Sequence, residues 1–504
     1  MSNETEILSA AGIQARIRQS IGGLLTGKSL KAKALRGGAW LGSSSLAEQA
    51  ARFVRNLILV RLLAPSAFGT VAIVLSTGLV LQAFTEVGVR EALVQNRRGA
   101  ENEFVNAAWW MAFIRSLLVW TTLSLAAPLV ARFYGNPELT PLLRIAVLGL
   151  VLEGAMSARA YVAIKDMKFS RWALISNGGG ILGVVLTVVL SFVIRDVWAL
   201  VIGTVSESAA RCVLSYAVCP WLPSLHVDRK SLKDLFEYSK GVFGVPLLSL
   251  IFLRTDVFVL GKLLSAARLG LYTMGIAAGQ VPVVFVSNLL YQISLSTLSQ
   301  IQEDKARTNR VIIRITSLVA AVGAPALAFA YFCAGPVLTI IYGRPYAVTA
   351  GPLFVALCAA LISLANTQIT GVFYAWGMPG LHRRCVAAMA ITMIVLVYPF
   401  SMWLGPLGAQ LASLISITVG FGLQLERIHH VTGLGLSEYA ISIARSAVPS
   451  AAVVVVCLAA RLLSWPTNPL RSIAIGAVGC LVAYALVCIM LLRQQAPAEV
   501  PSCG

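Results

Sequence analysis

The stretch Arg52 to Gly69 reads RFVRNLILVRLLAPSAFG and joins the end of one long apolar segment to the start of the next. Arg61-Leu-Leu-Ala-Pro-Ser-Ala-Phe-Gly69 has an echo at Lys262-Leu-Leu-Ser-Ala-Ala-Arg-Leu-Gly270, an offset of 201 (262 − 61). Two further matches follow in the same order: Tyr134-Gly-Asn-Pro137 with Tyr342-Gly-Arg-Pro345, and, more loosely, 161–171 with 374–384. Three matches in the same order, with a slowly growing offset, indicate an internal duplication.

The composition defines the class of protein. Of 504 residues, 58% are hydrophobic and 12% are charged, whereas soluble domains have about 25% charged residues. Such a chain is a polytopic membrane protein, and its long apolar runs predict an all-α fold because each spanning segment must satisfy its own backbone. We expect about fourteen transmembrane helices, near 38–62, 67–94, 104–131, 139–163, 173–194, 197–219, 241–264, 270–298, 312–333, 347–376, 384–404, 406–426, 439–463 and 471–492.

The duplication and the loop lengths predict the domain organisation. Each repeat holds six helices, and an even number returns the chain to the same side, so the two lobes are parallel repeats. The last two helices have no counterpart in the first half. The predicted parts are a basic N-terminal segment 1–37, an N-lobe 38–219, a linker 220–240, a C-lobe 241–426, helices 13 and 14 within 427–493, and a tail 494–504.

The net charge of +19 is a topology signal rather than a nucleic-acid footprint. Every second loop is basic, with about 22 Lys and Arg on one side of the membrane and about 8 on the other. The positive-inside rule then places both termini in the cytosol, with the chain crossing the membrane many times. Nucleic acid is thereby excluded as a partner. The nine Cys form no CxxC pair, and nothing in the sequence indicates a cofactor, a metal site or an enzyme motif.

Charges inside the predicted spans carry the functional information. Ten arginines facing lipid would cost roughly 25–35 kcal/mol, so those near mid-membrane must face a partner or a wet cavity. The ten are Arg52, Arg55, Arg90, Arg115, Arg144, Arg159, Arg211, Arg254, Arg314 and Arg445. Six acids accompany them: Glu48, Glu86, Glu91, Glu153, Glu207 and Asp256.

Helical spacing shows which of these charges can pair. Glu48, Arg52 and Arg55 share one helix face, as do Glu86 with Arg90 and Glu207 with Arg211. Arg55 and Arg115 have no acid within reach on their own face. Arg254 and Asp256 lie on different faces, and Asp256 occupies the position that matches Arg55 in the repeat. A net-basic cavity favours an anionic substrate, since arginine binds phosphate bidentately and keeps its proton.

Four motifs together resemble the polysaccharide transporter family. They are the Leu-x-Pro-x-x-Phe-Gly turn ending at Gly69, Thr-Asp-x-x-x-Leu-Gly-Lys at Thr255–Lys262, Leu269-Gly-Leu-Tyr272, and Tyr-Gly-x-Pro-Tyr from Tyr342. That family includes the Wzx-type flippases of O-antigen and exopolysaccharide export. It belongs to the multidrug/oligosaccharidyl-lipid/polysaccharide exporter superfamily, to which the lipid II flippase is related.

The resemblance implies two six-helix lobes with a central cationic cavity that works by alternating access. The implied substrate is an oligosaccharide on undecaprenyl diphosphate, moved for exopolysaccharide, O-antigen or capsule biosynthesis, with polymerase and export machinery as further partners. The family pattern carries over to Arg52, Arg55, Arg90 and Arg254 as cavity residues, and spacing adds Arg115. We assign coupling or gating roles to Glu48, Glu86 and Asp256.

Two alternatives remain open at this stage. A cation-coupled multidrug exporter of the same superfamily would usually have twelve helices and an acid-centred cavity. A membrane O-antigen polymerase or ligase would carry a large periplasmic loop, whereas every outer loop predicted here is short. The fourteen predicted helices and the mostly basic cavity candidates disfavour the drug exporter, and the short outer loops disfavour the enzyme.

Overall fold

The structure is a computed structural model, and it describes residues 30–84, 88–242, 245–299, 304–464 and 468–495. These residues are helical almost throughout and contain no strand, which confirms the predicted all-α class. Helix α2 (Leu30–Leu62) begins within the predicted basic N-terminal segment, the rest of which lies outside the described residues. Most of the predicted tail lies outside them as well.

The chain divides into two compact units. One holds the described parts of Met1–Leu62 and Leu81–Phe243, and the other holds Leu63–Val80 with the described parts of Gly244–Gly504. The boundaries fall between α2 and helix α3 (Pro65–Phe84), inside α3 between Val80 and Leu81, and just before helix α12 (Val245–Leu263). The predicted lobe limits 38–219 and 241–426 stay a prediction.

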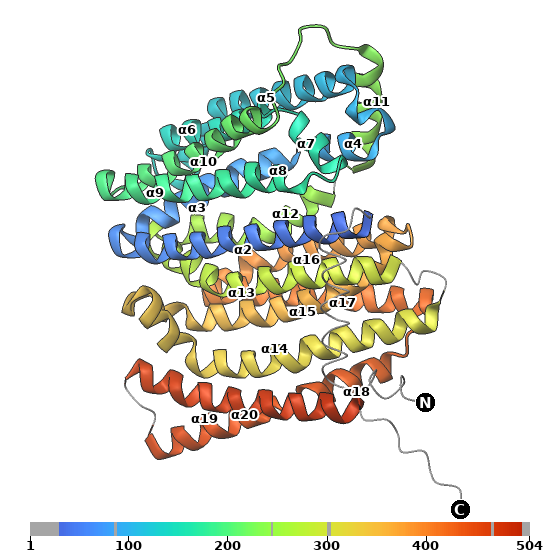
Figure 1. The fold of residues 1–504 in the computed structure, drawn as a ribbon. Helices are drawn as coiled ribbons and strands as arrows, with labels where there is room; N and C mark the ends of the chain where they lie inside the picture. Colours follow the sequence, from blue (N-terminus) through green and yellow to red (C-terminus); the bar gives the residue numbers. More distant parts are fainter. Residues whose placement is uncertain (1–29, 85–87, 243–244, 300–303, 465–467, 496–504) are drawn as a thin grey trace, which may run out of the picture. The chain divides into compact units, whose positions relative to one another are not determined.

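The first unit is built on five long helical segments, coloured blue to green in Figure 1. Helix α5 packs on α6, α6 on α10, and α10 on α9, while α2 lies against α8 and α9. The elements after α2 and the end of α3 are α4 (Val89–Gln95), η2 (Arg97–Ala100), α5 (Asn102–Tyr134), α6 (Leu139–Gly154), α7 (Arg159–Lys165), α8 (Phe169–Ala173), η3 (Leu174–Gly178), α9 (Gly179–Ile194), α10 (Val197–Val218) and α11 (Arg229–Val242).

Two predicted spans of the first unit are interrupted. The second, expected as one helix over 67–94, is not continuous, because a separate helix, α4, begins at Val89 after Gly88, whose backbone is left-handed with φ of 60°. Glu86, which we expected on one face with Arg90, lies outside the described residues. The fourth span bends by 56° between α6 and α7. In the fifth span, η3 is a single π-helical turn, a feature that often marks functional sites.

The predicted linker 220–240 is partly helical, since α11 occupies its second half. Asp228 starts this helix by accepting hydrogen bonds from the backbone and hydroxyl of Ser231, at 2.9 and 2.6 Å. Leu232 and Leu235 then face α4 and α5, where Leu235 is fully buried. Part of the predicted linker is therefore helical, and its role as the connection between the two repeats stays a prediction.

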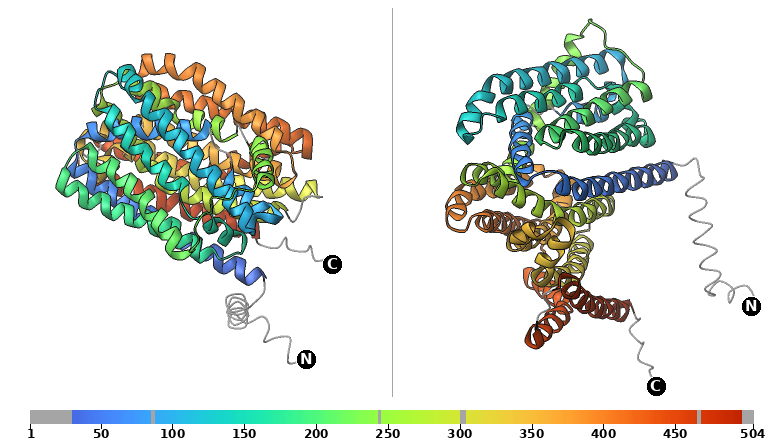
Figure 2. Two further views of the ribbon diagram at one scale, coloured as in Figure 1. Left: turned by 90° about the horizontal axis from the view of Figure 1, so that it is seen from above. Right: turned by 90° about the vertical axis from the view of Figure 1, so that its left-hand side faces the viewer.

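The second unit holds the remaining helices and the first part of α3. After α12 these are α13 (Ala266–Ser299), α14 (Lys305–Tyr342), η4 (Arg344–Thr349), α15 (Ala350–Ala375), α16 (Pro379–Leu404), α17 (Pro406–Thr432), α18 (Leu436–Ala447), α19 (Ser450–Ser464) and α20 (Pro469–Gln495). Helix α16 packs on α17, and α13 on α15. The right-hand view of Figure 2 shows α19 and α20 as an adjacent pair in red, and both contact α14.

The two echoing stretches of the sequence meet inside this second unit. Gly69 of α3 and Gly270 of α13 pack backbone to backbone. A Cβ atom at Gly69 would lie 1.9 Å from the carbonyl oxygen of Ala266, and one at Gly270 would lie 1.7 Å from that of Pro65. Small residues permit such close helix contacts in membranes. The repeated Leu-Leu…Gly motif therefore marks a helix crossing as well as a turn.

Membrane-spanning capacity follows from length and hydropathy. Within the described residues, nine helices are long and apolar enough to cross a bilayer, or up to eleven when each of two bent pairs counts as one span. The second bent pair is α18 with α19, at 42°. The protein is thus a multi-span membrane protein, and the number fourteen stays a prediction.

Candidate functional site

A ring of ion pairs joins α2 to α10 in the first unit. Arg52 donates to Glu48, one turn before it, from Nε at 3.0 Å and from Nη2 at 2.7 Å, and it also pairs with Glu207. Arg211 closes the ring, with Nη2 at 2.7 Å from Glu207 Oε1 and 3.5 Å from Glu48 Oε1. Two arginines and two glutamates therefore neutralise each other across two helices.

The ring lies against a glycine face of α9. A Cβ atom at Gly180 would lie 2.3 Å from Glu48 Oε1, and one at Gly183 would lie 2.3 Å from Glu207 Cβ. With its amide oriented to satisfy both ends, Asn177 donates to Glu48 Oε2 at 2.9 Å. Only 12% of each glutamate side chain is exposed. Because these glycines have no side chain, α9 can pack directly against the four charged groups.

The spacing of residues along each helix predicted the two ion pairs of this ring that lie within one helix. Glu48 with Arg52 and Glu207 with Arg211 are pairs of residues four apart, as expected. The crossing of α2 with α10 unites them, and the sequence carries no local signal of it. Arg52, expected to bind substrate, is thus already held by two carboxylates.

Arg55 differs from its neighbour Arg52. Its guanidinium contacts only the side-chain oxygen of Asn56, from Nη2 at 3.3 Å and from Nε at 3.4 Å. Within the described part of the chain, Arg55 has no ion pair with a carboxylate. It is half-buried on a helix of the first unit.

Two more predicted residues, Arg90 and Arg115, line one pocket of the first unit. The pocket measures about 270 Å³ and lies where α6 breaks into α7. Its polar lining also includes residues that the prediction did not assign to the site: Gln82, Glu91, Glu153 and Tyr161. Arg90 lies over the ring of Trp172, with 5.1 Å between the guanidinium carbon and the ring centroid.

The acid of the second unit has neutral partners. Tyr272 of α13 donates its hydroxyl hydrogen to Asp256 Oδ2 at 2.5 Å, and Gln410 of α17 donates to the same hydroxyl oxygen. Arg254 is exposed on another face of α12, as the two-residue spacing predicts. Neither Arg254 nor Asp256 has an ion pair within the described residues. Sequence reasoning found Asp256 but missed Tyr272 and Gln410.

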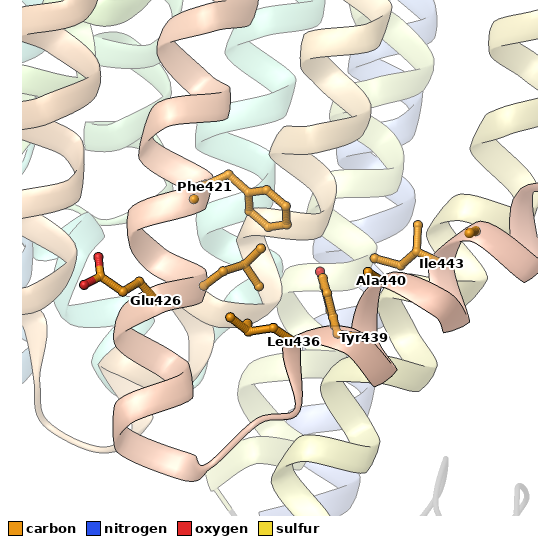
Figure 3. A pocket seen from close by; sticks show the side chains of 9 residues that line it. Phe421, Glu426, Leu436, Tyr439, Ala440 and Ile443 are labelled. Atoms are coloured by element: carbon orange, nitrogen blue, oxygen red, sulfur yellow. The ribbon is translucent and has the colours of Figure 1, made fainter.

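The second unit also has an apolar groove of about 550 Å³ between α17 and α18, shown in Figure 3. Phe421, Leu436 and Ile443 form its walls, and Glu426 and Tyr439 are its polar members. This lining does not suit a charged or strongly hydroxylated group. The pocket of the first unit is therefore the better candidate for contact with a polar substrate.

The long apolar helices are those of a multi-span membrane protein. The fold supports this, because 90% of the chain matches 99% of the lipid II flippase MurJ in its inward closed conformation, with a TM-score of 0.72 at 13% identity. An inward-facing multidrug resistance MATE family transporter of the MOP superfamily matches 82% of the chain and 98% of its own length, with a TM-score of 0.58 at 15% identity.

The chain belongs to the polysaccharide biosynthesis protein family, whose model matches residues 58–350. It is 24% identical over 299 residues to the succinoglycan biosynthesis transport protein ExoT of Rhizobium meliloti, covering 59% of this chain and 60% of ExoT. It is 20% identical over 431 residues to the teichuronic acid biosynthesis protein TuaB of Bacillus subtilis, covering 84% and 87%. These findings confirm the predicted family and a transporter rather than an enzyme.

Proposed function

We propose that this protein is a flippase that moves an undecaprenyl-diphosphate-linked oligosaccharide across the bacterial inner membrane. The product would serve exopolysaccharide, O-antigen or capsule biosynthesis. Family membership and the names of the relatives support the substrate class, since ExoT is a transport protein of succinoglycan biosynthesis. The predicted topology, with both termini cytosolic, is part of the proposal, as are a polymerase and export machinery as partners.

One observation supports an anionic head group in particular. Arg55 is a half-buried charge in a helix of the membrane domain, without a carboxylate partner among the described residues. A charge at such depth is costly unless something compensates it. A diphosphate supplies two negative centres and the acceptor oxygens that a guanidinium binds bidentately. Arg254 of the second unit, exposed and likewise unpaired within the described residues, is a further contact in this proposal.

The structure modifies the roles proposed for individual residues. Arg52 and Glu48 belong to the neutral ring, so we assign them to holding α2 against α10 and to presenting Arg55. We retain Arg55, Arg90, Arg115 and Arg254 as cavity residues, because a cationic cavity suits the substrate. Asp256 is retained for coupling or gating, since a carboxylate hydrogen-bonded to neutral groups can change its protonation without breaking an ion pair.

The test begins with a strain that lacks the gene and measures on which leaflet lipid-linked oligosaccharide accumulates. Accumulation on the cytosolic leaflet, relieved by the intact chain, is the expected result. Accumulation of single units on the periplasmic leaflet would instead indicate a polymerase or ligase. Unchanged lipid intermediates together with lost resistance to cationic dyes would indicate a multidrug exporter, whose fold is also similar.

Substitution of Arg55 then tests the site. We expect Arg55→Gln to lower export at least tenfold, because a charged hydrogen bond to the head group contributes about 1.5–3 kcal/mol. The exposed Arg132 of α5 provides the control, as Arg132→Gln removes the same charge near a helix end. Equal export by wild type and Arg55→Gln at equal protein levels would remove Arg55 from the site.

A further inference from the structure

The pocket at the break between α6 and α7 has a rigid wall. The carbonyl oxygen of Ala155 accepts hydrogen bonds from Trp109 Nε1 at 3.2 Å and from the Tyr216 hydroxyl at 2.8 Å. The Ser157 backbone donates to Ser215 Oγ at 2.9 Å, and the Ser157 hydroxyl donates to the carbonyl of Cys219 at 2.9 Å. Side chains thus satisfy the backbone that the break exposes, and the irregular segment is held in one conformation.

In a membrane protein, a break of this kind indicates backbone that is either buried in protein or part of a cavity wall. Non-helical backbone at membrane depth occurs where it is buried in protein or lines a cavity. Interrupted helices are also the usual walls of substrate sites in transporters. Here Glu153 and Gly154 before the break, and Met156, Ala158 and Tyr161 within or after it, all line the pocket. Gly88 ends a second interruption beside it, at the start of α4.

The polar lining mixes both signs of charge. Arg90 and Glu91 are exposed neighbours in the first turn of α4, and neither has an ion pair within the described residues. Arg90 is held in place by stacking on Trp172. Glu153 accepts a hydrogen bond from Ser208 at 3.3 Å and lies 3.7 Å from Arg211. Gln82 adds an amide that can both donate and accept.

This lining selects among the parts of a lipid-linked oligosaccharide. A diphosphate would be repelled by the two glutamates that share the pocket with the arginines. A polyprenyl chain would leave the charged groups without polar partners. Sugar hydroxyls both donate and accept, so adjacent hydroxyls can donate to a carboxylate and accept from a guanidinium. A volume of about 270 Å³ equals roughly nine water molecules, which is room for one sugar ring and too little for several.

We propose that the α4–α6–α7 pocket binds a single sugar ring of the transported head group, with Glu91 and Arg90 as its hydrogen-bonding pair. This inference rests on the proposed function and adds a recognition site for glycan within the first unit. The tyrosine and tryptophan of the lining give the ring an apolar wall, as aromatic side chains do at other polar binding surfaces. Binding of the sugar is then separable from binding of the diphosphate.

The experiment compares two lipids on the purified full-length protein in nanodiscs. One is bare undecaprenyl diphosphate, and the other is the same lipid carrying the repeat unit extracted from the producing cells. Their affinity ratio measures the contribution of the glycan. We expect the wild type to prefer the glycosylated lipid, and Glu91→Gln to reduce this ratio roughly tenfold without changing the affinity for the bare lipid. Glu138→Gln, which neutralises an exposed acid at the start of α6, is the matched control.

Each other outcome has a defined meaning. An unchanged ratio in both Glu91→Gln and Arg90→Gln, with melting profiles like the wild type, overturns the inference. An equal loss of affinity for both lipids would assign the pocket to the diphosphate and also overturn it. A wild type that binds both lipids without preference refutes the sugar site and leaves the proposed function standing. A wild type that binds neither lipid refutes the proposed function itself.

Discussion

The two units enclose polar groups in opposite ways. The first packs two arginines and two glutamates into a closed ring between α2 and α10. The second holds one carboxylate, Asp256, on a tyrosine hydroxyl that a glutamine supports. A bilayer protein can therefore accommodate interior charge by mutual neutralisation or by hydrogen bonds from neutral groups. The first arrangement depends on every member, whereas the second tolerates loss of its charge.

We expect the largest difference in unfolding free energy between two variants that each remove one negative charge, one from the ring and one from the Asp256 site. Glu207→Gln leaves Glu48 to pair with both arginines and Glu153 to pair with Arg211, and we expect a loss of about 2–3 kcal/mol in unfolding free energy. This is less than for a fully buried pair, because 27% of Arg52 and 23% of Arg211 stay exposed. Asp256→Asn keeps an oxygen for Tyr272 and should cost less than about 1 kcal/mol. Unfolding titrations in mixed micelles measure both, and equal losses would contradict the comparison.

Alanine substitutions at the glycines of α9 test how tightly the ring is packed. Gly183→Ala would place its Cβ 2.3 Å from Glu207 Cβ and 2.7 Å from Glu207 Cα, atoms that cannot rotate away. We expect a cost of about 1–3 kcal/mol, as for other overpacked positions. Gly180→Ala meets only the carboxylate end of Glu48, which can move. The same titration should show the smaller loss for Gly180→Ala, and the reverse order would show that Glu48 is the more rigid partner.

The tyrosine of the second unit allows a smaller test. Tyr272→Phe removes the hydroxyl that bridges Gln410 to Asp256 and leaves both without that partner. A loss of about 1–2 kcal/mol is expected, since unsatisfied buried polar groups cost this much. In the double variant Tyr272→Phe with Asp256→Asn, the two losses should not add, because the residues share one hydrogen bond. Additive losses would show that Asp256 is held by other groups.

Exposed charges at α11 should have the smallest effect. Hydrogen bonds from Ser231 hold the pKa of Asp228 below its ordinary value of 3.8. A lowered pKa in the folded state stabilises that state at pH values above the ordinary pKa. This stabilisation disappears as the pH falls through the folded-state pKa. The protection of amides in the first turn of α11, measured as exchange relative to the intrinsic rate at each pH, should therefore fall only below pH 3.8. Ser231→Ala should move the onset upward, and an unchanged onset would mean that Ser231 does not set this pKa.

The sequence predicted those features that depend on local pattern. Hydropathy revealed the helices, and residues four apart revealed the pairs Glu48 with Arg52 and Glu207 with Arg211. It did not predict that the two pairs combine, because that depends on how distant helices pack. The pocket was missed for a similar reason. The break after Gly154 contains no proline, and its backbone is satisfied by Trp109, Tyr216 and Ser215 from other helices.

The ring between α2 and α10 also constrains how the protein is made. Arg52 and Glu207 are separated by 155 positions in the chain. At a synthesis rate of about 5–20 residues per second, α2, which the sequence predicts to be the first span, is made roughly 8–30 s before α10. During that interval only Glu48, on the same helix, can neutralise Arg52. The spacing of four residues thus lets Arg52 pair with Glu48, and Arg211 with Glu207, before the two helices meet, and assembly keeps these pairs and adds those between the helices.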